Sequence, residues 1–438
     1  MTANPAQPGR TQSSLADSDP SSGSRGAMRI GIHDFSGHPF QVQLSRELAS
    51  RGHEVVHWHC PSYVTGKGAV EASSADPPTF RLQPIPLTRA FSKYSMRRRL
   101  SQERAYGRAL SAAAAAFAPD VLVSSNNPLL SQQVLLRTCE RLGVPFVFWQ
   151  QDIYSVAMAR AAKSRYPVLG STMGRYLLRL EASMLRRSAK VVAISEDFLP
   201  VLRSWGVRDE NVVVIENWAP LDDLPMAPRD NAWARERDLT DSRVFLYSGT
   251  LGVKHNPEML VELAEQYRGT DTRVVVLSEG LGADFLRRAS AQRGLDNLEV
   301  LPFQPFEQLP MVFASADVLV AILDAPAGSY SVPSKVLSYH CAGRPILAAL
   351  PQDNLAARVV ERAKSGIVVD PSSTDAFVSE ARRLLEDQEL RLRCGENART
   401  FAETAFDIDQ IADRFEAIFA ELVPAAATRN RASQGGGT

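Results

Sequence analysis

The feature of this sequence that most constrains its fold is a regular alternation of short apolar runs with longer amphipathic segments. The run at 28–32 leads through a glycine-containing loop into a helical pattern at about 40–51, and further strand patterns follow at 54–60, 120–125 and 145–150. Strands that alternate with helices of this length are joined by crossovers, so they lie parallel in one sheet. We therefore expect a doubly wound α/β domain over residues 28–216.

The alternation starts again after an interruption. Residues 217–242 contain three prolines, many charges and no apolar period, which is typical of a linker. A second series then runs from 243 to 422, with strands expected at 243–249, 273–280, 298–303 and 317–323 and two helices at its end. The last helix is a candidate to pack back on the first domain. Since ligands of open α/β sheets bind beyond the carboxyl ends of the strands, we expect two Rossmann-like domains facing across a cleft.

Composition narrows the class of protein. The sequence has 49 Lys and Arg against 49 Asp and Glu, which disfavours a nucleic-acid partner. The four cysteines lack paired spacing, which favours a cytoplasmic location, and no run approaches the roughly 20 apolar residues of a spanning helix. Segments 1–27 and 423–438 are expected to be disordered because they are rich in small and polar residues.

Two strand ends in the first half carry candidate site residues. The loop at 34–40 lacks the G-x-G-x-x-G spacing of a dinucleotide site, but Gly37 could let it pass close to a sugar or phosphate and His38 could donate to that group. Asp152, after the strand at 145–150, could orient a substrate hydroxyl. A purely structural role is an equal alternative for both His38 and Asp152.

No metal and no cofactor are expected. His57 and His59 alternate along one strand and Cys60 follows them, but no further ligand with zinc-like spacing comes after these residues. We therefore interpret these three residues as an ordinary strand end.

Two loops of the second half suit a phosphate. In 247–260, Gly249 and Gly252 free the backbone, Lys254 adds a cation and a helix begins near Pro257. A generic glycine-rich turn is the alternative.

The second phosphate-like loop lies within 324–345. A short helix is expected to begin at Pro333, and Ser331, Ser334 and Lys335 lie at its start. A cation at that end is locally unfavourable unless an anion binds there. The alternative is again a structural turn.

Two stretches, 89–110 and 175–187, mix arginines with apolar residues. That composition suits an anionic membrane surface or a lipid diphosphate, which would place the protein at the cytoplasmic face of a membrane. A solvated helix face is the more ordinary explanation of each stretch.

Four segments of the second half, SGTLG-x-KHN, LSEG, ADVLVAIL and VPSKVLSYHCAGRPILA, occur in the order found in one enzyme family. They resemble the retaining glycosyltransferases of family 4, which have the GT-B fold of two Rossmann-like domains. The resemblance covers about residues 28–422 and is nearest to the bacterial O-antigen and capsule group, including proposed N-acetyl-L-fucosamine transferases.

The resemblance implies the roles of further residues. The donor would contact Gly249, Thr250, Gly252, Lys254, Ser331, Val332, Pro333, Ser334 and Lys335. Thr250 stands where many members have Arg, while Tyr330 and Ser338 stand where two glutamates eight residues apart usually contact the donor. Ser338 can still bond a ribose hydroxyl, and Glu279 is a spare carboxylate. The base is expected against 303–306, which includes Phe303 and Pro305.

The activity implied is a metal-independent, retaining transfer of a sugar from a nucleotide diphosphate, expected to be UDP, to a cell-surface glycan precursor on a lipid. His38 and Asp152 would orient the substrates while Lys254 stabilises the leaving group. Alternatives on the same fold are a nucleotide-sugar epimerase or a sugar phosphorylase. The replaced glutamates also leave open a catalytically impaired nucleotide-sugar-binding partner.

Overall fold

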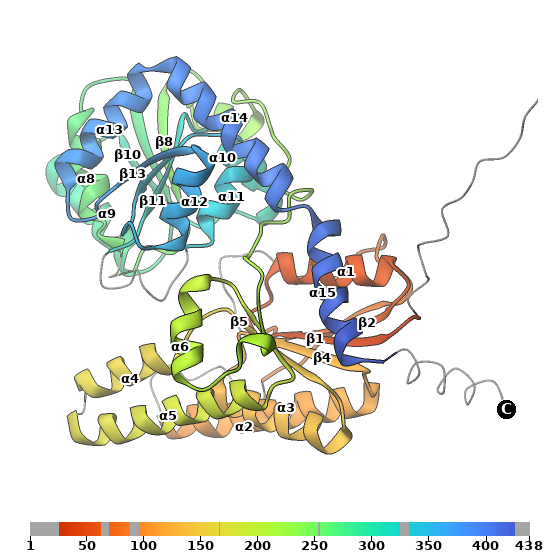
Figure 1. Cartoon of the computed structure of the whole chain (residues 1–438). Coiled ribbons are helices and arrows are strands. Elements are labelled where there is room, and N and C mark those ends of the chain that lie inside the picture. Colours follow the sequence, from red (N-terminus) through yellow and green to blue (C-terminus); the bar gives the residue numbers. More distant parts are fainter. Residues whose placement is uncertain are drawn as a thin grey trace, which may run out of the picture.

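Two parallel β-sheets, each covered by helices on both faces, form the core of the chain (Figure 1). The computed structural model describes residues 26–62, 70–87, 96–165, 167–252, 255–324 and 333–424. The central strands of both sheets are buried along almost their whole length, which explains their continuous apolar sequences. The expected class, two doubly wound α/β domains, is confirmed.

The first sheet has seven strands in the order β3-β2-β1-β4-β5-β6-β7. Its strands are β1 (Arg29–Asp34), β2 (Glu54–His59), β3 (Phe80–Pro84), β4 (Val121–Ser125), β5 (Phe146–Gln150), β6 (Lys190–Ala193) and β7 (Val212–Val214). The helices of this half are α1 (Pro39–Ser50), α2 (Met96–Phe117), α3 (Leu129–Leu142), α4 (Tyr154–Arg165), α5 (Pro167–Arg187) and α6 (Leu199–Ser204).

The second sheet has six strands in the order β10-β9-β8-β11-β12-β13. They are β8 (Arg243–Ser248), β9 (Thr272–Leu277), β10 (Leu298–Leu301), β11 (Val318–Ile322), β12 (Ile346–Ala349) and β13 (Gly366–Val369). The helices are α7 (Ala232–Glu236), α8 (Glu258–Gln266), α9 (Leu281–Arg293), α10 (Leu309–Ala314), α11 (Lys335–Cys341), α12 (Leu355–Ala363), α13 (Thr374–Glu386), α14 (Gln388–Ala405) and α15 (Ile408–Leu422).

Several elements differ from the sequence patterns. Three helices, α13 to α15, end the described chain where two were expected, because Asp387 and Asp407 cap the starts of α14 and α15 and so divide the long helical pattern. β3 and β7 were not anticipated, since β3 is a largely exposed edge strand and β7 has only three residues.

The segment 217–242, which was expected to be a linker, packs against the rest of the protein. It contains α7, and its side chains Trp218, Leu224, Trp233 and Leu239 are buried. Trp218 packs against Phe40 and Trp149 of the first domain, whereas Trp233 donates to Gln304 of the second, so these side chains pack on different domains and show no helical or strand period.

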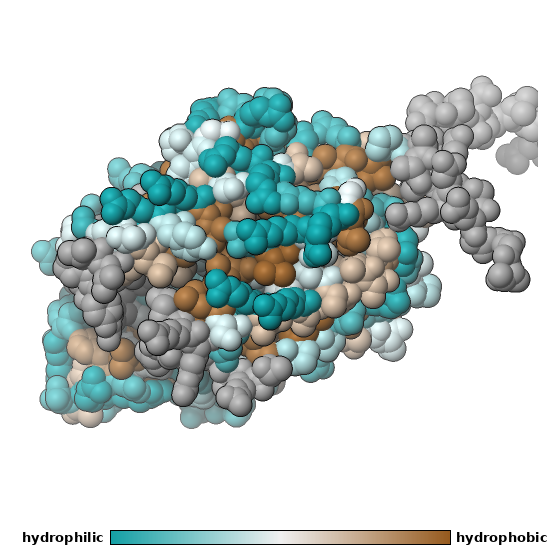
Figure 2. Space-filling model, turned by 90° about the horizontal axis from the view of Figure 1, so that it is seen from below, coloured by the Kyte–Doolittle hydropathy of each residue, from teal (hydrophilic) through white to brown (hydrophobic). Residues whose placement is uncertain are grey.

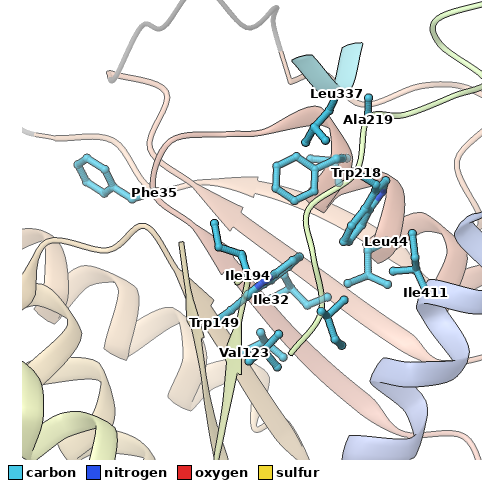
Figure 3. Close-up of a cluster of buried hydrophobic side chains, with 14 of the residues drawn as sticks. Ile32, Phe35, Leu44, Val123, Trp149, Ile194, Trp218, Ala219, Leu337 and Ile411 are labelled. Atoms are coloured by element: carbon cyan, nitrogen blue, oxygen red, sulfur yellow. The ribbon is translucent and has the colours of Figure 1, made fainter. Parts of the chain in front are cut away.

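The last helix, α15, crosses to the first domain and packs on α1 (Figure 1). Phe415 of α15 lies 4.9 Å from the Trp149 ring, and Trp149 stacks on Trp218 at 5.8 Å between ring centroids. Figure 3 shows Trp149, Trp218 and Ile411 of α15 in one buried cluster. The C-terminal helix thus completes the core of the N-terminal half.

The carboxyl ends of the two sheets lie on facing sides of the two domains. Arg358 of α12, which follows β12, donates to Asp197 after β6 at 2.6 Å. Arg362 donates to Glu216 after β7 at 3.1 Å. Leu337 of α11 belongs to the same buried cluster as Ala219 (Figure 3). In each of these contacts, a residue that follows a strand of the first sheet meets a residue that follows a strand of the second sheet.

No helix within the described ranges is long and apolar enough to cross a membrane.

Candidate functional site

The turn after β8 has a backbone that is fixed on several sides. Gly249 has a φ of +127°, which residues with a Cβ rarely adopt. The Tyr247 hydroxyl donates to the Thr250 carbonyl at 2.9 Å, and the Leu251 N–H donates to Ser278 Oγ at 3.0 Å. The turn at 249–252 therefore presents main-chain groups at a defined position beyond the strand.

Lys335, the first residue of α11, lies directly beside this turn. Its Nζ is 3.6 Å from the centroid of the Tyr247 ring, and a Cβ built on Gly249 would lie 3.3 Å from the same nitrogen. The buried Tyr339 hydroxyl accepts from the Ser248 N–H at 2.8 Å, which ties α11 to the end of β8. The two phosphate-like loops of the sequence thus meet at one point, where Lys335 is the cation among the residues that the structure describes.

The other described donor candidates follow neighbouring strands at the same edge of the sheet. Because β10, β9, β8 and β11 are adjacent and parallel, the residues that follow them share that edge. The candidates that are exposed are Thr250, Glu279, Pro305 and Ser334. Those that are partly buried are Gly252, Phe303, Pro333 and Ser338. Phe303 and Pro305 follow β10, the edge strand, which is separated from β8 by one strand.

Four candidates, Lys254, Tyr330, Ser331 and Val332, lie outside the described residues. Their roles stay predictions from the sequence. Next to the first of them, buried His255 accepts from the Gly252 N–H at 2.9 Å through Nδ1, which closes the end of the 249–252 turn.

A buried carboxylate, Asp34, organises the loop after β1 in the first domain. Its Oδ2 accepts from the backbone N–H of His38 and lies 2.7 Å from His38 Nδ1, while Oδ1 accepts from the Ser36 N–H at 3.0 Å. Burial disfavours the charge on Asp34, but the charge and hydrogen bonds of His38 outweigh it and hold the pKa of Asp34 well below its usual value. Gly37, with a φ of +65°, allows this tight loop.

Asn126, after β4, joins that loop to the start of α4. Its Nδ2 donates to Asp34 Oδ1 at 3.1 Å, and its Oδ1 accepts from the Tyr154 hydroxyl at 3.2 Å. Its φ is +51°, a left-handed conformation that Asn tolerates better than most residues. One amide therefore connects the ends of β1, β4 and β5 in a polar cluster.

Asp152 lies between β5 and α4 and is partly buried. Close to it, Glu181 of α5 is fully buried and accepts from the Ser155 N–H at 2.9 Å. Burial raises the pKa of Glu181 to about 7, against the hydrogen bonds of Ser155, and the charge of Asp152 adds to the rise. Two carboxyl groups with different environments thus flank the first turn of α4.

The histidines of β2 belong to the core of the sheet. His57 is fully buried, its Nδ1 lies 2.8 Å from Ser45 Oγ, and burial lowers its pKa to about 3. Within the described residues no group of three or more His, Cys, Asp and Glu side chains is placed to hold a metal ion.

The two basic stretches differ in how much of them is described. α5 is amphipathic: Leu177, Leu180 and Leu185 are buried, and Arg175 and Arg179 are exposed. Figure 2 shows the face of the molecule that carries α2, α3 and α5, where hydrophobic surface lies between hydrophilic side chains. The part of the other stretch at 89–95 lies outside the described residues.

Sequence reasoning missed Asp34 and Asn126. The available signal was Asn-Asn-Pro directly after a buried strand, since Asn often occupies the left-handed conformation at such turns. That signal indicates a turn but not the partners of the amide.

Two family models match the two halves of the chain. Residues 40–223 match the model described as Glycosyltransferase Family 4, and residues 230–401 match the one described as Glycosyl transferases group 1.

Curated proteins match over part of their length. The chain is 26% identical over 250 residues to a protein named as the colanic acid biosynthesis glycosyl transferase WcaI of Escherichia coli (strain K12), covering 56% of this chain and 60% of that protein. It is 27% identical over 192 residues to alpha-D-kanosaminyltransferase of Streptomyces kanamyceticus, covering 43% and 48%. The chain thus spans about half to three-fifths of these relatives.

Solved structures share the fold over nearly the whole chain. Anabaena Alr3699/HepE in complex with UDP and glucose has a TM-score of 0.66 at 15% identity, covering 90% of this chain and 100% of that one. Sucrose-phosphate synthase from Thermosynechococcus elongatus has a TM-score of 0.67 at 16% identity, covering 90% and 99%. With two family models matching the two parallel-sheet domains, the chain belongs to the family 4, group 1 glycosyltransferases and has the GT-B fold.

Proposed function

We propose that this chain is a retaining, metal-independent glycosyltransferase that transfers a sugar from a nucleotide-diphosphate sugar, UDP-linked, to a cell-surface glycan precursor carried on a lipid. One observation carries the proposal. Lys335 and the 249–252 turn meet at the carboxyl end of β8, on the side of the second domain that faces the first.

This arrangement suits a diphosphate leaving group. When the bond from the sugar C1 to the phosphate oxygen breaks, its electron pair stays on that oxygen, and negative charge develops there. A lysine ammonium and fixed main-chain N–H groups stabilise such charge without a metal, because they need no reorganisation during the reaction. Lys335 supplies the ammonium, and Lys254 is proposed to add a second one.

For a retaining transfer, the acceptor oxygen bonds to C1 on the face from which the phosphate departs, and its proton passes to the departing phosphate oxygen. The first domain would then only position the acceptor. The Asp34–His38–Asn126 cluster has this character, since its groups are held by one another. Asp152 is proposed to orient a hydroxyl from the neighbouring strand end.

UDP is proposed as the nucleotide because fold neighbours were solved in complex with UDP and UDP-glucose. Ser338, partly buried on α11, is proposed to bond the ribose, and Phe303 and Pro305 to border the base. Glu279 is the exposed carboxylate at this edge and is proposed to compensate for the residues that replace the usual glutamates.

Cell-surface glycan synthesis is supported by the names of relatives, which include WcaI and the glycosyltransferase WbjE of Pseudomonas aeruginosa. The exposed arginines of α5 suit the anionic headgroups at the cytoplasmic face of a membrane, where a lipid-linked acceptor would be found.

The donor site is tested by titrating the protein with UDP and UDP-sugars in EDTA by calorimetry. Lys335→Gln should weaken UDP binding about tenfold or more, since one charge-assisted contact is lost. Lys364→Gln removes an exposed lysine of the same domain and should leave binding unchanged. Equal affinities of the wild type and Lys335→Gln would refute this placement of the diphosphate.

The reaction is tested by incubating the protein with a panel of nucleotide sugars and lipid-linked acceptors and identifying products by mass. Transfer should require the acceptor. Conversion of the sugar without acceptor would indicate an epimerase, a requirement for free phosphate would indicate a phosphorylase, and binding without turnover would contradict an enzymatic role.

A further inference from the structure

A pocket lies at the amino ends of the strands of the second sheet, whereas the proposed donor site lies at their carboxyl ends. It has a volume of about 390 Å³ and is lined by residues that precede β11 and β12, among them Asp317 and Arg344. These are the amino ends of the strands, whereas Gly249 and Lys335 lie at carboxyl ends. The pocket is therefore separate from the proposed donor site.

Three arginines line this pocket, and two of them are held by the protein. Arg391 donates to the Leu384 and Leu385 carbonyls at 3.0 and 2.8 Å. Arg399 donates to the Cys341 carbonyl at 2.9 Å and pairs with Glu403.

Arg344 is the exception among the three. Its guanidinium has no hydrogen bond and no ion pair within 4.0 Å to any residue that the structure describes, although its side chain is partly buried. It follows Gly343, whose φ of +63° turns the chain sharply after α11.

The acidic residues of the pocket compensate this charge only in part. Asp317 Oδ2 accepts from Arg229 at 3.0 Å and from the Val244 N–H at 2.8 Å, and Glu396 is exposed. Burial lowers the pKa of Arg344, Asp317 opposes this fall, and the charges of Arg229 and Arg391 add to it. A partly desolvated cation among other cations is costly unless an anion is bound.

We propose that this pocket binds the phosphate group of a small molecule, gripped by the Arg344 guanidinium with Arg391 and Arg399 beside it. Arg presents a planar fork of donors that fits two phosphate oxygens at once. The volume exceeds that of a phosphate and lies in the range of small-molecule sites. The exposed side chains of Met226 and Leu392 border the space for the remainder of the ligand.

The position of the pocket links it to both connections between the domains. Met226 belongs to the 217–242 linker, and Leu392 belongs to α14, which leads directly into the crossing helix α15 (Figure 1). A ligand held there contacts both segments.

Thermal unfolding in Hepes buffer at constant ionic strength tests the proposal, with saturating UDP present so that any donor site is occupied. Orthophosphate and a hexose phosphate are titrated separately, with chloride as the salt control. Either phosphate should raise the midpoint of the wild type. A larger effect of the hexose phosphate identifies an organic phosphate as the ligand, and equal effects identify free phosphate.

Arg344→Gln should lower the phosphate affinity about tenfold or more, and Arg344→Lys should lower it less, because the charge remains but the fork is lost. Arg393→Gln, an exposed arginine of α14 outside the pocket, is the matched control and should behave as the wild type. Without phosphate, Arg344→Gln should unfold at no lower temperature than the wild type, since the removed charge has no hydrogen bond or ion pair to any described residue. An unchanged phosphate effect in Arg344→Gln, the absence of any effect beyond chloride in the wild type, or a strongly destabilised Arg344→Gln would each overturn the proposal.

Discussion

Replacing Glu181 by Gln should change how the stability of the protein depends on pH. Glu181 is fully buried against the first turn of α4, and its Oε2 accepts from the Ser155 N–H at 2.9 Å. A glutamine can keep that acceptor but cannot ionise. The variant therefore resembles the protonated wild type at every pH.

The expected magnitude follows from the pKa. Burial raises the pKa of Glu181 from 4.5 to about 7, so between these two pH values the unfolded chain has released a proton that the folded chain still holds. Stability therefore falls as pH rises through this window, and the loss is complete above pH 7. At about 1.4 kcal/mol per pKa unit, the full effect is about 3 kcal/mol. Relative to the wild type, Glu181→Gln should thus be about 3 kcal/mol more stable at pH 8 than it is at pH 4.5.

Urea unfolding of both proteins, followed by tryptophan fluorescence at a series of pH values, measures this difference. The variant and the wild type are measured side by side because two buried histidines affect both proteins equally. Burial lowers the pKa values of His33 and His57 to about 3, so the stability of both proteins falls as pH decreases below 6.5. Glu210→Gln, at an exposed position, is the control. A difference between Glu181→Gln and the wild type that stays constant across the pH range would refute the reasoning.

Three further perturbations follow from the geometry. Gly249→Ala forces a Cβ into a φ of +127° and to 3.2 Å from the Lys335 side chain, so UDP affinity measured by calorimetry should fall severalfold with secondary structure retained by circular dichroism. Glu416→Gln removes one of the carboxylates that pair with Arg51 where α15 contacts the first domain. The free energy of unfolding, measured with urea, should fall by about 2 kcal/mol. An unchanged midpoint of urea unfolding would show that this ion pair does not anchor α15. Asn126→Gly and Asn126→Ala both remove the hydrogen bonds to Asp34 and Tyr154, but only Ala is strained at a φ of +51°. In thermal unfolding the Ala variant should therefore be less stable than the Gly variant by about 1 kcal/mol. The reverse order of stability would contradict backbone strain at this position.

Much of the fold could be predicted from local sequence. Buried parallel strands must be continuously apolar, so strands such as β4 and β8 were located to within a residue or so. The exposed edge strand β3 lacks that signal because polar residues alternate with its apolar ones, and β7 is apolar but has only three residues. The packed state of 217–242 could not be predicted either, since its buried tryptophans contact residues distant in sequence.

Some features of the candidate site could likewise be predicted from local sequence, and others could not. Glycines after strands pointed to Gly249 and Gly37, since a chain that turns sharply at a strand end shows it in its own residues. The hydrogen-bond partners of buried polar groups depend on which strands become neighbours. No local sequence pattern indicates the order of the strands in a sheet. The contacts of the Asn126 amide with Asp34 and Tyr154, and of Lys335 with the Gly249 turn, therefore emerged only once the sheets had brought together residues tens of positions apart.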